Sequence, residues 1–232
     1  MIFKALASSS SGNAYIVDDG ETRILLECGL SHTKLQKLCG FKLSAFHGVF
    51  VSHEHKDHSK CAKELVGRGL EVFMSQGTAD ALEIEGVTIV ADMEQINVGT
   101  LDVVPFATFH DAREPLGFLI KSRRDGDVLA FATDTVNLRY QFPGLTILAI
   151  EANYDKHILE RCERMPEKVR YRITNSHMEI DTLCGYLREL DLTRCREIHL
   201  LHLSDATSHE GHFINKVTHI APPWVTVAAC EK

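Results

Sequence analysis

Residues 51–58 read Val-Ser-His-Glu-His-Lys-Asp-His, and this stretch decides how the rest of the chain is interpreted. The histidines of this stretch follow an apolar run, 48–51, that is typical of a buried strand. Side chains two positions apart in extended chain point to the same side, so His53 and His55 can approach one ion. Asp57 and His58 lie where a helix is predicted to begin, from which both can turn toward a second ion.

These four residues predict a metal site. The chain has 13 histidines, and an isolated histidine is more often a surface residue or a hydrogen-bonded core residue than a ligand. Four ligand-type residues within six positions instead favour metal binding or catalysis. Imidazole and carboxylate together suit zinc, manganese or iron better than magnesium or calcium.

Length and composition predict a single domain over residues 1–232, because 44% hydrophobic residues are enough to bury one sizeable core. Lysine and arginine number 25 and aspartate and glutamate 32, which gives a net charge of 25 − 32 = −7. This sign argues against a broad, non-specific surface for duplex nucleic acid, although a local basic groove stays compatible with it.

The N-terminal residues lack the apolar core of a signal peptide, and no segment approaches the roughly 18 apolar residues of a membrane helix. We therefore expect a soluble, cytoplasmic protein without a membrane partner. The seven cysteines are scattered and form no C-x-x-C pair, which predicts reduced thiols rather than a disulfide framework.

Strand and helix patterns alternate along the chain, which is typical of an α/β fold. Among the expected strands are 14–18 and 23–29, joined through a turn at Asp19-Gly20, and a closing edge strand at 225–230. Helices are expected at 59–68, directly after the histidine-rich stretch, and at 180–190.

The segment His53-Glu54-His55-Lys56-Asp57-His58 resembles the H-x-H-x-D-H signature of the metallo-β-lactamase fold. Other segments resemble the YycJ/WalJ-type branch of that superfamily, namely 8–13, 110–112 with 114–117, 133–135 and 151–155. The resemblance extends from about residue 2 to about residue 205. It implies an αββα sandwich, in which two mixed β-sheets pack together with helices on their outer faces.

The resemblance also implies a set of site residues. One ion is expected on His53, His55 and His110, a second on Asp57, His58 and His202, and Asp134 is expected to bridge them. The implied cofactors are two divalent ions, zinc or manganese, with iron as a further candidate. Asp57 and His177 are the expected catalytic residues, with His177 as a proton donor or phosphate contact. Substrate binding is expected at Ser11, Asn13, Asn153 and His177.

Two positions depart from the family pattern. Glu27 stands where the superfamily usually has aspartate, and we expect it to orient a ligand histidine without binding metal directly. Tyr154 stands where the related branch usually has histidine, which predicts an altered substrate contact.

Segment 161–172 carries five basic and two acidic residues. The segment is compatible with attraction of a substrate phosphate and with an ordinary solvated helix and turn, and we favour the helix and turn.

The resemblance implies a metal-dependent phosphodiesterase or nuclease that uses a metal-activated hydroxide. Its substrate is expected to be single-stranded nucleic acid or a nucleotide, including a cyclic mononucleotide as in phage anti-Pycsar enzymes. Thioester hydrolysis, β-lactam hydrolysis and a non-catalytic metal-binding module are the alternatives. Family members are often dimers, so a homodimer is also expected.

Overall fold

The computed structural model describes residues 1–163 and 165–230, and the chain divides into two compact units. Unit 1 comprises residues 1–107 and 112–127, and unit 2 comprises residues 108–111 and 128–230. The single domain expected over residues 1–232 stays a prediction.

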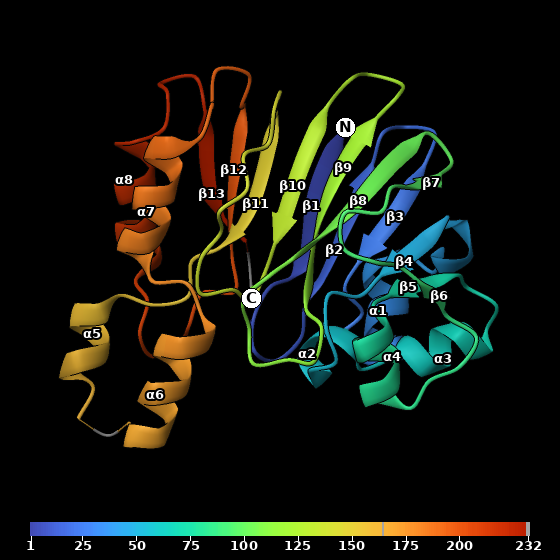
Figure 1. The fold of residues 1–232 in the computed structure, drawn as a ribbon, viewed down its shortest axis with the longest axis horizontal. Coiled ribbons are helices and arrows are strands. Elements are labelled where there is room, and N and C mark those ends of the chain that lie inside the picture. The colour runs from blue at the N-terminus through green and yellow to red at the C-terminus, as the bar shows by residue number, and fades with distance from the viewer. Residues whose placement is uncertain (164, 231–232) are drawn as a thin grey trace. The chain divides into compact units, whose positions relative to one another are not determined.

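The elements follow one another along the chain as labelled in Figure 1. The strands are β1 (Ile2–Ala7), β2 (Ala14–Asp18), β3 (Arg23–Leu26), β4 (Gly48–Phe50), β5 (Val72–Met74), β6 (Thr88–Ile89), β7 (Ile96–Val98), β8 (Leu101–Ala107), β9 (Leu116–Ser122), β10 (Val128–Ala132), β11 (Ile147–Glu151), β12 (Glu197–Leu201) and β13 (Thr226–Ala229). The helices are α1 (His32–Leu38), α2 (Lys56–Ser59), α3 (Ala62–Gly67), α4 (Gln76–Leu82), α5 (Lys156–Arg161), α6 (Glu167–Ser176), α7 (Ile180–Glu189) and α8 (Glu210–Thr218), with a short 3₁₀ turn at Leu43–Ala45.

The strands form a six-stranded and a seven-stranded sheet, both mixed, so the expected α/β class is confirmed. The six-stranded sheet lies in unit 1 in the order β1-β2-β3-β4-β5-β6. Its first three strands are antiparallel, and the predicted turn at Asp19-Gly20 joins β2 to β3. From β3 to β6 the strands are parallel, so their carboxyl ends lie at one edge of the sheet.

In unit 1 both faces of the six-stranded sheet are covered. Helices α1, α3 and α4 gather beside one face, where Leu35 and Leu65 pack with Val49 and Val72 (Figure 1). On the other face, the ring of Phe50 meets the edge of Phe118 in β9, with ring centroids 5.4 Å apart. The antiparallel strands β7, β8 and β9 thus contribute part of the second sheet in this unit.

Unit 2 contains the parallel strands β10, β11, β12 and β13 of the seven-stranded sheet. Every residue of β10 and β11 is buried, which agrees with their continuous apolar sequence. Helix α7 buries Leu183 and Leu187, as its helical spacing predicts, and packs beside α8. Strand β13 is an edge strand, as expected.

Three elements differ from the expectation. The helix predicted over 59–68 is two helices, α2 and α3. In a continuous helix Cys61 would donate to the Asp57 carbonyl, but that carbonyl accepts from Asn13, and Cys61 N–H donates to Cys28 O at 3.1 Å. Strand β7 and helix α5 were not predicted. Within residues 1–163 and 165–230, no helix is long and apolar enough to cross a membrane.

Candidate functional site

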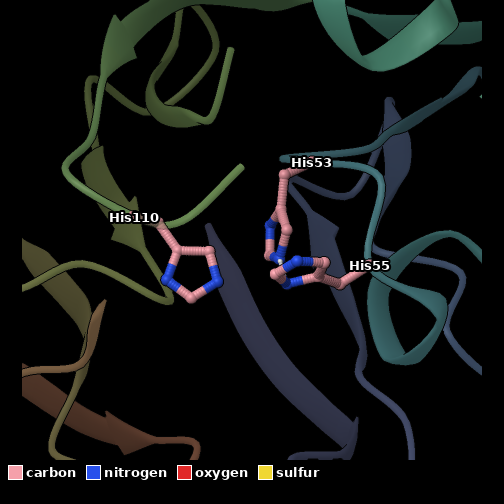
Figure 2. A group of neighbouring side chains, drawn as sticks. All are labelled: His53, His55 and His110. Atoms are coloured by element: carbon pink, nitrogen blue, oxygen red, sulfur yellow. Dashed lines mark hydrogen bonds between the residues drawn. The ribbon is translucent and has the colours of Figure 1, made fainter. Parts of the chain in front are cut away.

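In unit 1 the histidine-rich stretch lies directly after β4, at the carboxyl edge of the parallel strands. His53 is buried, and its Nδ1 atom shares a 2.8 Å hydrogen bond with the Ser52 hydroxyl. Its Nε2 atom lies 3.2 Å from Nδ1 of His55, and Figure 2 shows these two imidazoles close together. The ring of His58 lies 4.2 Å from that of His53. Three imidazoles of the stretch therefore converge.

Asp57 and His58 lie in α2, the short helix whose start was predicted at this place. His55 is its N-cap residue, so the chain turns from extended to helical within the stretch. Asp57 Oδ2 lies 3.3 Å from His58 Nε2. Unit 1 thus brings all four predicted ligands to one corner.

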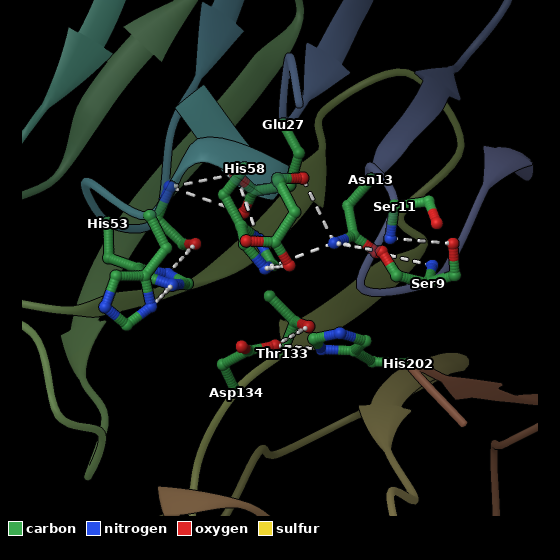
Figure 3. A network of polar contacts seen from close by, with 12 residues as sticks. Ser9, Ser11, Asn13, Glu27, His53, His58, Thr133, Asp134 and His202 are labelled. Carbon is green, nitrogen blue, oxygen red and sulfur yellow. Dashed lines mark hydrogen bonds and ion pairs between the residues drawn. The ribbon is translucent and has the colours of Figure 1, made fainter. Parts of the chain in front are cut away.

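Asn13 connects the corner formed by residues 53–58 to the serine-rich loop 8–13 through hydrogen bonds, as Figure 3 shows. Its side-chain amide lies 3.1 Å from both the Asp57 carbonyl and His58 Nε2, and its backbone N–H donates to the same carbonyl at 2.7 Å. Asn13 is fully buried, whereas Ser11 in the same loop is exposed. These contacts assign Asn13 a positioning role, and direct substrate contact by Ser11 and Asn13 stays a prediction.

Gly29 permits the close approach of this corner to the strand end after β3. A Cβ atom at this position would lie 1.6 Å from the Asp57 carbonyl oxygen and 2.8 Å from His58 N. Both atoms are backbone, so no side-chain movement could relieve the clash. The local sequence predicts no role for Gly29 beyond the end of a strand, because the steric reason depends on residues almost thirty positions away.

Glu27 lies behind the histidines. Its carboxylate is fully buried, lies 3.3 and 3.4 Å from the Ser52 N–H that donates to it, and has Oε2 3.6 Å from Nδ1 of His58. This geometry is compatible with the expected role, in which the carboxylate orients a ligand histidine from behind.

In unit 2 the expected ligands Asp134 and His202, together with the carboxylate of Glu151, also lie at the ends of parallel strands. Asp134 comes after β10, Glu151 ends β11, and His202 follows β12. His202 Nδ1 and Asp134 Oδ1 form a hydrogen bond, visible in Figure 3. Asp134 Oδ2 lies 3.5 Å from Nε2 of His110, the third residue labelled in Figure 2. Carboxyl ends of parallel strands are a common location for ligand sites in α/β proteins.

The buried carboxylate of Glu151 and the partly buried imidazole of His177 form a hydrogen-bonded pair. The Nδ1 atom of His177 lies 2.6 Å from Glu151 Oε1, while Glu151 Oε2 accepts from Thr135 N–H at 2.8 Å and Met178 N–H at 3.0 Å. Burial alone would lower the pKa of His177, but the adjacent Glu151 carboxylate, helped by Asp134, raises this pKa to about 9. The pair can hold the ring with Nε2 directed away from Glu151.

Glu151 was not predicted as a site residue. Its position at the end of an apolar run, beside a segment already matched to the family, was the available signal. Only folding shows that this carboxylate contacts His177, 26 positions away.

Neighbouring side chains hold these groups in place. The Asn153 amide donates to the His202 carbonyl at 2.8 Å, and His110 Nδ1 lies 2.7 Å from the Ser176 carbonyl. Asn153 is 5% exposed, and its predicted contact with substrate stays a prediction. Tyr154 is also buried, which raises the pKa of its hydroxyl to about 12.

His199 and the basic segment have structural partners. His199 Nε2 lies 3.0 Å from Glu197, on the side of β12 expected for a non-ligand. Arg170 donates to the carbonyls of Leu159 and Met165. Arg172 donates to Asp111 at 2.9 Å. These contacts agree with the favoured interpretation of 161–172 as an ordinary helical segment, in which Arg164 lies outside the described residues.

Three site residues have left-handed backbone angles. The φ angles of Glu27, Asp134 and His202 are 65°, 45° and 54°, and each residue directly follows a strand or lies within two positions of its end. Residues other than glycine rarely adopt these angles, and strain of this kind clusters at functional sites.

The donor atoms fit divalent ions with a preference for nitrogen and oxygen. In unit 2, one ligand atom from each of Asp134, Glu151, His177 and His202 lies within 4.8 Å of the others. Two of these side chains are buried carboxylates, which need positive charge nearby. Imidazole and carboxylate donors suit zinc and manganese, and the three imidazoles of unit 1 suit the same metals.

Comparison with known proteins supports the fold and the family. The model of the β-lactamase superfamily domain matches residues 22–203. The exodeoxyribonuclease YycJ of Bacillus anthracis is 27% identical over 219 residues, which is 87% of this chain and 82% of that protein.

Solved structures show the same fold at low identity. The metallo-β-lactamase fold protein YhfI of Bacillus subtilis has a TM-score of 0.76 at 14% identity, over 99% of this chain and 95% of that one. Zn²⁺-bound PqqB of Methylobacterium extorquens has a TM-score of 0.73 at 13% identity, over 100% of this chain and 99% of that one.

Proposed function

Because this chain belongs to the β-lactamase superfamily, we propose that it is a metal-dependent phosphodiesterase that hydrolyses single-stranded nucleic acid from an end. The observation that carries the proposal is the convergence of His53, His55, Asp57 and His58 after β4. The similarity to an exodeoxyribonuclease over 87% of the chain supports the choice of substrate.

The proposed ligand set is the one that the superfamily pattern implies. We assign His53, His55 and His110 to one ion, Asp57, His58 and His202 to a second, and Asp134 to both. Zinc or manganese is proposed, with iron as a further candidate. When bound, such ions would lower the pKa of water toward about 7 and neutralise charge on a phosphoryl group.

The chain's own residues supply orientation and protons. His177 is proposed to donate the Nε2 proton to the leaving oxygen, while Glu151 holds Nδ1 and stabilises the protonated ring. Asp57 is proposed to accept a hydrogen bond from the attacking water. Glu27 and Asn13 would act indirectly, by holding His58.

A cyclic mononucleotide is the second candidate substrate, favoured by the net charge of −7, which disfavours long polyanions. Thioester and β-lactam hydrolysis use the same signature motif and are therefore included as outcomes of the test below. The expected cytoplasmic location and homodimer stay predictions.

The first experiment measures hydrolysis of bis-p-nitrophenyl phosphate, nitrocefin and a thioester, with and without added Mn²⁺ or Zn²⁺. We expect metal-dependent turnover of the diester alone, abolished by Asp134→Ala and retained by His199→Ala, the matched histidine control. End-labelled single-stranded DNA, RNA and cyclic mononucleotides then rank the substrates. Turnover of nitrocefin or the thioester instead would place the chain in another functional branch of the superfamily.

A second experiment isolates the proton donor. His177→Ala should lower kcat on an oligonucleotide, whose alkoxide leaving group needs a proton, by about 10²- to 10⁴-fold. The loss on bis-p-nitrophenyl phosphate should be much smaller, because p-nitrophenolate leaves without protonation. Equal losses on both substrates would remove His177 from that role.

A further inference from the structure

An exposed aromatic ring precedes the candidate ligand His110. The side chain of Phe109 is 47% exposed, although its backbone is firmly held. Its N–H donates to the Thr135 hydroxyl at 3.0 Å, and its carbonyl accepts from Val136 N–H at 2.9 Å. Exposure of this ring is therefore a property of an ordered loop.

The loop that fixes Phe109 is itself joined to the site residues of unit 2. Thr135 follows Asp134 directly, and its N–H donates to Glu151 Oε2 at 2.8 Å. His110, the next residue after Phe109, lies 3.5 Å from Asp134. The backbone of Phe109 is thus held at a defined position, next in sequence to the proposed ligand His110.

A cation accompanies the ring. The guanidinium carbon of Arg139 lies 5.7 Å from the centroid of Phe109, in cation–π geometry. Arg139 is exposed, and a guanidinium stacked on a ring still presents N–H groups at its edge. The neighbouring carboxylate of Asp111 is paired with Arg172 at 2.9 Å, which reduces its repulsion of a nearby anion.

We propose that Phe109 and Arg139 form a nucleotide subsite, in which the base next to the scissile phosphodiester stacks on Phe109 and Arg139 contacts a neighbouring phosphate. This inference rests on the proposed function and specifies its substrate. Every base has a π-face, so stacking on an aromatic side chain binds single strands of any sequence. Bases inside a duplex are already stacked, so the subsite selects an unpaired end.

The subsite also explains how a protein with a net charge of −7 binds a polyanion. Stacking supplies affinity without neutralising phosphates. With Arg139 as the phosphate contact of the subsite, we expect Arg139→Gln to reduce the slope of log K against log salt by about 0.7, the value for one phosphate of a single strand.

The test compares a single-stranded oligonucleotide carrying an ordinary terminal base with the same strand carrying an abasic terminal residue. Phe109→Ala should lower kcat/KM for the ordinary strand about 5- to 150-fold, which is the range for one stacked base. It should leave kcat/KM for the abasic strand unchanged, and Phe109→Trp should restore the difference. Phe41→Ala, which removes an aromatic side chain that is 71% exposed in unit 1, is the matched control.

Binding gives a second readout that does not need turnover. Fluorescence anisotropy of a labelled single-stranded oligonucleotide in EDTA should show weaker binding by Phe109→Ala and an unchanged affinity for Phe41→Ala. Equal loss on ordinary and abasic strands would overturn the subsite. A change in molecular mass of Phe109→Ala by sedimentation, without base dependence, would assign the ring to an interface between copies and also overturn it. Failure of the wild-type protein to hydrolyse any phosphodiester would refute the proposed function, whereas the binding arm tests the subsite separately.

Discussion

Asp19 provides the sharpest test of how unit 1 is held together. Its side chain is 4% exposed and closes the turn between β2 and β3. Oδ1 accepts from the N–H groups of Glu21 and Thr22 at 3.0 and 2.8 Å, and Oδ2 accepts from the hydroxyls of Thr100 and Ser122 at 2.6 and 2.9 Å. One carboxylate therefore links the six-stranded sheet to β8 and β9.

The size of this contribution follows from the pKa of Asp19. Burial would raise this pKa, but the hydrogen bonds, that of Thr100 foremost, outweigh burial and lower it from 3.8 to about 2. At about 1.36 kcal/mol per pKa unit, the ionised carboxylate stabilises the folded state by about 2 kcal/mol. Because the folded-state pKa is the lower one, this stability is complete above pH 4 and is lost as the pH falls toward 2.

Asp19→Asn keeps the shape and removes the charge. Its free energy of unfolding, measured by urea denaturation with circular dichroism, should be about 2 kcal/mol below wild type at pH 7. The difference should shrink between pH 4 and pH 2. Asp80→Asn, on the exposed surface of α4, should stay within about 0.5 kcal/mol of wild type. A deficit of equal size at pH 7 and pH 3, or none at pH 7, would refute the electrostatic reasoning.

The remaining predictions concern the site itself. Gly29→Ala, which would drive a Cβ atom against the Asp57 carbonyl, should lower the free energy of unfolding by about 1–3 kcal/mol and abolish activity, both measured on the purified protein. Gly185→Ala, in open space on α7, should instead raise stability by about 0.5–1 kcal/mol, and the opposite order would contradict the steric argument. Glu27→Gln should weaken zinc binding 10- to 100-fold in a chelator competition, because the carboxylate no longer holds His58, and unchanged affinity would remove its orienting role. Chelator treatment should lower the thermal midpoint and abolish diester hydrolysis, with recovery on adding Mn²⁺ or Zn²⁺, and an unchanged midpoint would argue against a bound ion that stabilises the fold.

Local sequence was sufficient for the corner around His53 and for the elements beside it. The apolar run before the histidines predicts β4, and the change in spacing at Asp57 predicts the start of α2. The superfamily pattern adds His110, Asp134 and His202 as proposed ligands, which their own neighbours in sequence do not predict.

Contacts between distant segments decide what the sequence left open. The helix does not continue from α2 through Cys61, because Asn13 N–H occupies the Asp57 carbonyl that Cys61 would need. The sequence near residue 61 does not contain Asn13 and so cannot show this competition. Glu151 becomes the partner of His177 only when β11 and the end of α6 meet. The position of Phe109 has the same origin: an alternating strand pattern predicts a buried or an exposed side chain, but not that the Thr135 hydroxyl holds the backbone N–H of this residue.

The left-handed angles at Glu27, Asp134 and His202 have a consequence for how the proposed activity would be lost over generations. Glycine at any of these positions would keep the backbone path and relieve roughly 1–2 kcal/mol of steric strain, while a β-branched residue would increase it. Substitutions that raise stability at these positions would therefore remove side chains that the proposed chemistry needs. Inactive descendants of this chain are expected to carry glycine or asparagine there first, with their sheets intact.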